Sequence, residues 1–191
     1  DGGSGNHKGL MVPLLDNFIA AKKLPPMAIV FISPGVINGK GDGPGGQRSL
    51  EYDSVSGAFG DYIETEVLPK LSKDFGVKFT SNPEGRGAMG GSSSGAMAFT
   101  LGWFKPDKYR RILTYSGTFT KRISTPEHPK GAWEYHDSLI AASPKKPLRV
   151  YIHVSDKDNN FGGENNWEQA NRAMAKVFKE KGYHYRFHFS K

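Results

Sequence analysis

The sequence predicts an α/β fold in which a mostly parallel β-sheet is flanked by helices on both faces. Short apolar segments of strand length alternate along the chain with longer segments whose apolar residues recur at helical spacing. Stretches rich in glycine and proline separate these segments. The alternation runs through all 191 residues without a linker or an internal repeat, so we expect residues 1–191 to form one domain.

The helical segments share an apolar stripe with a spacing of three or four residues. In the first, Leu14 and Phe18 lie on one face, and Pro25 ends the run. In the second, Pro69 interrupts the stripe, which predicts a kink near the end of the helix. The predicted helices are Leu10–Leu24, Ser56–Gly76, Gly95–Phe104 and Asn165–Gly182.

Five shorter segments are predicted as strands. The run Met27–Ser33 is continuously apolar and bounded by prolines, which is typical of a strand buried on both faces of a parallel sheet. The loop that follows it is dense in glycine and proline, and we expect it at the edge of a functional site. The other predicted strands are Gly87–Gly91, Tyr109–Gly117, Leu148–Ser155 and Tyr183–Ser190.

Composition excludes several classes of function. No apolar run approaches the ~18 residues that a membrane helix needs, so we expect no membrane partner. The net charge is +7, but the basic residues are scattered, which argues against a nucleic-acid partner. The chain has no cysteine, which excludes disulfides, thiol catalysis and thiolate metal sites but does not identify the compartment.

The stretch "MGGSSSGAMAF" places three serines between a predicted strand and a predicted helix. A nucleophilic serine on such a strand–turn–helix elbow needs small residues two positions before and after it. Ser93 has Gly91 and Gly95 at these positions, whereas Ser92 and Ser94 have glycine on one side at most. We therefore predict Ser93 as the nucleophile, with its hydroxyl lifted out of the turn. The alternative is a helix-capping connection, with Ser92 or Ser93 as N-cap.

A reactive serine also needs a base and an acid that orients it. Asp156 and Asp158 follow a later predicted strand, and we favour Asp158 because it lies further into the loop. His184 and His188 are the histidines after this loop, and both lie within an alternating strand pattern. We expect the catalytic histidine beyond Lys191, with both ends of the chain falling inside a domain.

The segment "GGSSSGAMAFTLGWFKPDKYRRILTYSGTFT" resembles the enterochelin-esterase-like branch of the putative esterase family, which is related to esterase D and to feruloyl and acetylxylan esterases. The segments "RSLEYD", "SDKDNN" and "NNWEQANRAM" agree with it. The resemblance implies an α/β-hydrolase fold, truncated here at both ends. It also implies hydrolysis of carboxylic esters by a Ser-Asp-His triad that uses no metal and no cofactor.

Carried onto this sequence, the resemblance implies roles for particular residues. Ser93 matches the nucleophile and Asp158 the acid. The backbone N–H of Ser94 matches the oxyanion donor that follows the nucleophile, and the opening "DGG" matches the loop that supplies the second donor, through Gly2 or Gly3.

Arg48 and Glu51 match a polar pair beside the active site and are candidate substrate contacts. Their alternative role is a surface salt bridge. We expect the substrate to be an ester of a small molecule or one linked to a polysaccharide. We favour a periplasmic or secreted location over the cytoplasm, and the oligomeric state stays open.

Two other functions are consistent with the sequence. A catalytically silent module of the same fold would bind a carbohydrate or a protein partner, and the aromatic residues of Gly131–Asp137 would then serve as a sugar platform. A peptidase or lipase is less favoured, because the sequence has no long apolar lid segment.

Overall fold

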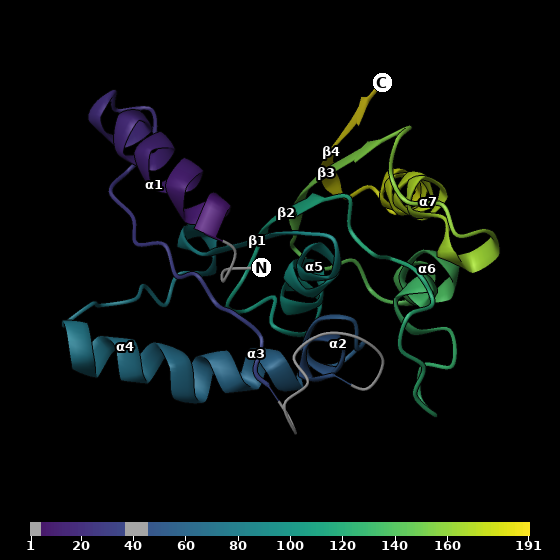
Figure 1. Cartoon of the computed structure of the whole chain (residues 1–191), viewed down its shortest axis with the longest axis horizontal. Coiled ribbons are helices and arrows are strands. Elements are labelled where there is room, and N and C mark those ends of the chain that lie inside the picture. The colour runs from purple at the N-terminus through teal and green to yellow at the C-terminus, as the bar shows by residue number, and fades with distance from the viewer. Residues whose placement is uncertain (1–4, 37–45) are drawn as a thin grey trace.

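The computed structural model describes residues 5–36 and 46–191, and its centre is a four-stranded parallel sheet in the order β1-β2-β3-β4 (Figure 1). The strands are β1 (Gly87–Gly91), β2 (Arg111–Tyr115), β3 (Arg149–Ser155) and β4 (His184–Ser190). The α-helices are α1 (Gly5–Ala20), α2 (Gln47–Tyr52), α3 (Ala58–Tyr62), α4 (Leu68–Phe75), α5 (Ser93–Phe104), α6 (Ile140–Ala142) and α7 (Trp167–Glu180). The predicted α/β fold with a parallel sheet is confirmed.

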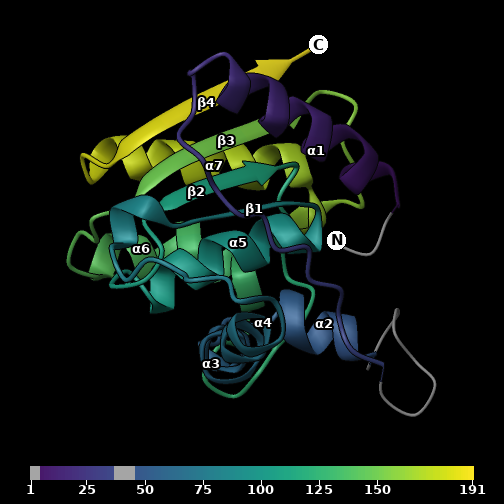
Figure 2. The ribbon, with the colours of Figure 1, turned by 90° about the vertical axis from the view of Figure 1, so that its left-hand side faces the viewer.

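Helices lie on both sides of the sheet, but the face toward α1 keeps exposed residues such as Met89 and Tyr115. Figures 1 and 2 show α5 and α7 on one face and α1 on the other. Parallel neighbours need a crossover connection, and α5 supplies it from β1 to β2 while α7 supplies it from β3 to β4. Within the described residues, no helix combines the length and the apolar character needed to cross a bilayer.

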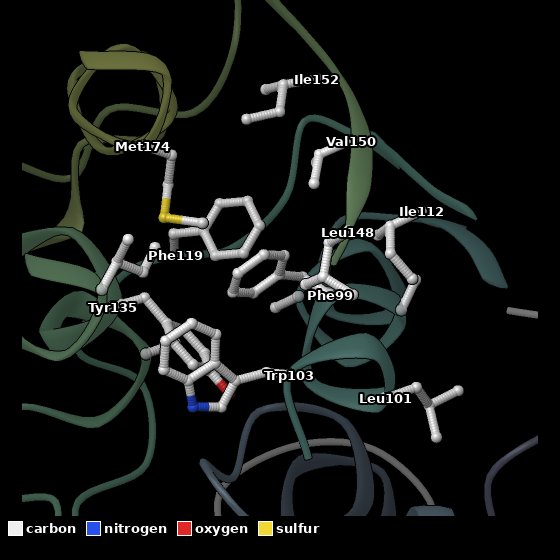
Figure 3. Close-up of a cluster of buried hydrophobic side chains, with 14 of the residues drawn as sticks. Phe99, Leu101, Trp103, Ile112, Phe119, Tyr135, Leu148, Val150, Ile152 and Met174 are labelled. Atoms are coloured by element: carbon white, nitrogen blue, oxygen red, sulfur yellow. The ribbon is translucent and has the colours of Figure 1, made fainter. Parts of the chain in front are cut away.

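The hydrophobic core lies between the sheet and the layer that contains α5 and α7. The ring of Phe99, on α5, is fully buried at its centre (Figure 3). The centroid of this ring lies 4.9 Å from that of Tyr135, 5.7 Å from that of Phe119 and 5.6 Å from that of Phe178. Residues of β2 and β3 that point toward this layer are buried as well, for example Ile152. This packing holds β1 and β2 against α5, and the candidate site lies where these strands end.

The prediction of a strand at Met27–Ser33 is wrong. The segment forms no strand in the structure, and the side chains of Met27 and Ile29 are exposed. Figure 2 shows the chain after α1 crossing the sheet instead of running beside a strand. One anchor comes from the Tyr52 hydroxyl, which donates a hydrogen bond to the carbonyl oxygen of Ile32 at 3.0 Å. Apolar content predicts burial, but a strand also needs a neighbour that pairs with its backbone.

The predicted second helix is continuous but irregular. α3 and α4 are joined by a π-helical segment, Ile63–Val67, directly before Pro69. Because proline lacks an N–H, the regular hydrogen-bond ladder is interrupted at this point, and the chain absorbs the interruption in the π-helical turn. The helix then ends where Gly76 adopts a left-handed conformation with φ of 66°.

Candidate active site

The segments that leave β1, β2 and β3 meet at one edge of the sheet. The register places Gly91 beside Tyr115 and Tyr115 beside His153, so the carboxyl ends of the three strands lie side by side. Ligand sites of open parallel sheets lie outside this edge. The three serines follow β1 and the two candidate aspartates follow β3, so the topology brings both groups to the same edge.

Ser92 forms the tip of the turn between β1 and α5. Its backbone has φ of 59° and ψ of −131°, which is a strained conformation for a residue other than glycine. Its N–H donates a hydrogen bond to the carbonyl oxygen of Tyr115 at 3.0 Å. Its carbonyl oxygen accepts hydrogen bonds from the N–H groups of Gly95 at 2.9 Å and Thr118 at 3.2 Å. Ser92 is half-buried. These features are typical of a nucleophile elbow.

Two glycines allow this tight turn. A Cβ atom on Gly90 would lie 2.2 Å from the carbonyl oxygen of Ser94, which no side chain could accommodate. A Cβ atom on Gly95 would lie 3.1 Å from the Cα atom of Gly117, in the segment after β2. The start of α5 approaches β1 so closely that position 90, two residues before Ser92, must be glycine. The pattern of small residues therefore fits Ser92 as well as Ser93.

The structure corrects the expectation for Ser93. Its hydroxyl does not point out of the turn, because Ser93 is the first residue of α5 and is fully buried. The hydroxyl donates a hydrogen bond to Oδ2 of Asp53 at 3.0 Å and accepts one from Nη1 of Arg48 at 3.1 Å. The tip of the turn is formed by Ser92 instead, which is half-buried. Although Ser92 is the N-cap residue of α5, its side chain makes no capping hydrogen bond.

The predicted oxyanion donor after the nucleophile was the N–H of Ser94, but with Ser92 at the tip the N–H that follows it is that of Ser93. The hydroxyl of Ser94 donates to the carbonyl oxygen of Gly91 at 2.7 Å and braces the end of β1. The N–H of Ser93, at the start of α5, makes no hydrogen bond within the described residues, so it can accept an oxyanion as partner. The predicted donors Gly2 and Gly3 lie outside the described residues.

Asp158 turns back over the ends of β2 and β3. Its Oδ2 accepts hydrogen bonds from the hydroxyl of Ser116 at 2.9 Å and from the N–H of Ser155 at 2.7 Å. Ser116 has φ of 49°, a second strained residue at this edge of the sheet. The alternative, Asp156, is exposed, and its N–H pairs with the carbonyl oxygen of Ser190. Asp158 is therefore tied by its side chain to the ends of β2 and β3, whereas Asp156 faces solvent.

The described histidines form hydrogen bonds elsewhere. His128 contacts Glu134, and His136 contacts the carbonyl oxygen of Phe119. On β3 and β4, the ring of His153 stacks on that of His188 with centroids 5.4 Å apart. None of the hydrogen bonds of the histidines that the structure describes reaches Ser92, Ser93 or Asp158.

Of the predicted polar pair, one member reaches the elbow. Arg48, on α2, hydrogen-bonds to Ser93 and lies over the ring of Tyr52. Burial raises the pKa of Tyr52 to about 12, so this ring stays neutral beside the guanidinium. Glu51 instead accepts hydrogen bonds from the N–H of Gly35 at 3.0 Å and from the Gln47 side chain at 2.8 Å.

Four polar residues at this edge were not singled out by sequence reasoning: Asp53, Ser116, Thr118 and Arg122. Asp53 is the last residue of the segment "RSLEYD", and the other three follow the predicted second strand of the elbow unit in "YSGTFTKR". Ser116, Thr118 and Arg122 could have been found from the sequence, because polar residues that end a predicted strand lie at the carboxyl edge of a parallel sheet.

Of the aromatic residues in Gly131–Asp137, Trp133 is half-buried and Tyr135 cannot serve as a sugar platform. Tyr135 is fully buried in the core and shares a hydrogen bond with Thr100 at 2.9 Å. Trp133 packs edge-on against the ring of His136, with centroids 4.4 Å apart. In the part of the chain that the structure describes, no three histidine, aspartate or glutamate side chains gather as metal ligands.

Comparisons with known proteins identify the family and relate the fold to solved structures. Residues 4–191 match the model of the family described as "Putative esterase". An enterochelin esterase from Shigella flexneri has a similar structure, with a TM-score of 0.71, 19% identity and coverage of 98% of this chain and 44% of that one. A ferulic acid esterase is similar with a TM-score of 0.63, 14% identity and coverage of 97% and 70%.

A second structure of the Shigella flexneri enzyme, in the presence of 2,3-dihydroxy-N-benzoyl-glycine, has a TM-score of 0.68 and 18% identity, with coverage of 95% of this chain. The chain spans 43% of the length of that esterase. No curated protein matches the sequence.

Proposed function

Because the chain belongs to the esterase family whose model matches residues 4–191, we propose that it is the core of a serine hydrolase that cleaves carboxylic esters. The observation that carries the proposal is the strained, half-buried serine at the tip of a strand–turn–helix elbow. Strain of this kind persists where the surrounding structure holds a reactive group in place.

We assign the nucleophile to Ser92 in preference to Ser93. The turn conformation that presents a nucleophile occurs at Ser92, whereas the hydroxyl of Ser93 is fully buried between Asp53 and Arg48. A substrate carbonyl can approach the tip of the turn, but it cannot reach a hydroxyl that two side chains enclose.

The reaction is an acyl transfer in two steps. The Oγ atom of Ser92 attacks the ester carbonyl carbon while a histidine takes its proton, and the carbonyl oxygen becomes an oxyanion that the N–H of Ser93 stabilises. The alcohol then leaves with the proton from the histidine. Water attacks the acyl-enzyme by the same route and releases the acid. Asp158 orients the histidine, which the family resemblance places after the last strand.

The substrate is an ester of a small molecule or one linked to a polysaccharide. Siderophore lactones, feruloyl or acetyl esters of polysaccharides and simple aryl esters are all members of this class. The guanidinium of Arg48 lies beside the elbow and supports a contact with a polar or anionic part of the substrate. Glu51 then acts indirectly, because it ties the start of α2 to the segment that contains Gly35.

A fluorophosphonate probe tests the proposal on the full-length protein. The phosphorus atom accepts the oxygen of an activated serine, fluoride leaves, and the adduct is located by mass spectrometry of the peptides. We expect an adduct on Ser92 in the wild type and in Ser93→Ala, and none in Ser92→Ala. Labelling of Ser93 would return the nucleophile to that residue. Absence of labelling in all three proteins would support a catalytically silent binding module.

A further inference from the structure

A buried carboxylate lies directly behind the elbow. Asp53 follows α2 and is only 2% exposed. Its Oδ2 accepts the hydrogen bond from Ser93 at 3.0 Å and faces Nε of Arg122 at 3.4 Å. Its Oδ1 accepts a hydrogen bond from the hydroxyl of Thr118 at 2.9 Å. The carboxylate therefore joins three segments that are distant in the sequence.

This charge is costly to bury. Taking a carboxylate out of water costs several kcal/mol, and apolar residues of similar volume often stabilise a fold as well or better. Ser93 and Thr118, the two hydroxyl donors, are also fully buried. A closed polar cluster of this kind, placed against a strained turn, fixes geometry more effectively than it adds stability.

Both hydroxyl partners act on the peptide group that joins Ser92 to Ser93. Ser93 follows Ser92 in the chain, and its N–H is the proposed oxyanion donor. Thr118 donates its own N–H to the carbonyl oxygen of Ser92 at 3.2 Å. Asp53 thus contacts Ser93 directly, and through Thr118 it is linked to the carbonyl group of Ser92.

We propose that Asp53 is a positioning residue that keeps the elbow, and with it the N–H of Ser93, in the geometry that stabilises the oxyanion. This inference rests on the proposed function, because the elbow must carry an acyl transfer for the geometry to matter. Asp53 does not contact the substrate in this role. It acts through Ser93 and Thr118.

Three substitutions in the full-length protein test the role. Asp53→Asn keeps the shape and one acceptor but removes the charge. Thr118→Val removes one donor to the carboxylate without changing the side-chain volume, and Thr118→Ser is its matched control because it keeps the hydroxyl. For each protein, kcat and KM for a p-nitrophenyl ester are measured together with the Kd of phenylboronic acid. The boron of this probe accepts the serine oxygen, whose proton passes to the base, and forms a tetrahedral adduct that mimics the oxyanion intermediate.

We expect Asp53→Asn to lower kcat on the order of 10²-fold while KM changes by less than about threefold. Thr118→Val should lower kcat about tenfold, the effect of one hydrogen bond to a charged group. The Kd of phenylboronic acid should rise by the same factors, and Thr118→Ser should behave as the wild type. A group that only supports folding would shift the melting temperature without this parallel change in kcat and boronate affinity.

The two proposals fail in different ways. If the wild type is active and Asp53→Asn keeps its kcat and its boronate affinity, the positioning role is overturned while the proposed function stands. If Asp53→Asn does not fold, the comparison of Thr118→Val with Thr118→Ser decides, and equal kcat values in the two overturn the role. A wild type that neither hydrolyses the ester nor binds the boronate overturns both.

Discussion

The two faces of the sheet differ although their residues alternate along the same strands. On the face that α5 and α7 cover, Ile112 and Ile152 are buried in the core. On the face toward α1, Arg111 pairs in register with Arg149, and both are exposed. Tyr151 on this face is half-buried, and Met89 and Tyr115 are exposed.

The covered face of the sheet supplies most of the buried area, and the candidate site is attached to this same face. The elbow serines begin α5, and Thr118 follows β2 on the covered side, so the candidate site is attached to the well-packed layer. Because close packing restricts side chains and backbone alike, this layer can hold a strained turn. The α1 face contributes less buried area, so we expect substitutions there to cost less. The predictions below test this comparison.

The largest effect is expected at the centre of the covered layer. Phe99→Ala removes a ring that contacts several other buried rings, and we expect it to lower the free energy of unfolding by about 3–5 kcal/mol. Chemical denaturation monitored by circular dichroism measures this. A loss below about 1 kcal/mol would show that the layer is not the main source of stability.

Adjacent residues of β3 give a direct comparison of the faces. Ile152 is fully buried and Tyr151 is half-buried on the opposite face. We expect Ile152→Ala to lower the free energy of unfolding by about 2–4 kcal/mol and Tyr151→Ala by less than half of that, although tyrosine is the larger side chain. The midpoints of urea unfolding compare the two. Equal losses would contradict the difference between the faces.

A half-buried histidine makes the covered layer sensitive to pH. Burial lowers the pKa of His136 below its ordinary value of 6.5, although the hydrogen bond to the Phe119 carbonyl partly opposes this. Below pH 6.5 the unfolded chain therefore binds a proton that the folded chain does not, and stability falls as the pH decreases. His136→Gln keeps a donor for Phe119 and should remove this component. Unfolding free energies of both proteins between pH 7 and pH 5 should diverge, and parallel curves would refute the assignment.

The smallest effect is expected on the α1 face. Arg111 and Arg149 are like charges directly opposite each other, which is unfavourable, and Arg149 is also 3.6 Å from Glu84. Arg149→Thr should therefore change the free energy of unfolding by less than about 0.5 kcal/mol, and the change should shrink further as salt increases. Unfolding at low and high ionic strength measures it. A loss as large as that of Ile152→Ala would place this face within the core.

Part of the candidate site could be predicted from the sequence. The glycines and serines of "MGGSSSGAMAF" predicted an elbow, and the loop after Ser155 predicted a carboxylate at the same edge, because both follow strands of a parallel sheet. The serine at the tip was misassigned, since two overlapping patterns of small residues centre on Ser92 and Ser93. The backbone conformation of Ser92 and the close approach of Gly90 to Ser94 show that the turn centres on Ser92.

The sequence by itself determined the alternation of strands and helices from Gly87 onward and the edge where the polar residues gather, because these follow from periodicity and from the geometry of parallel strands. The tertiary structure alone decided which serine forms the tip of the turn, that Met27–Ser33 forms no strand, and that Asp53 lies behind the elbow. These depend on close contacts between segments 40 or more residues apart, as with Ser93 and Asp53, and on the availability of a backbone partner. Neither leaves a periodic signal in the chain.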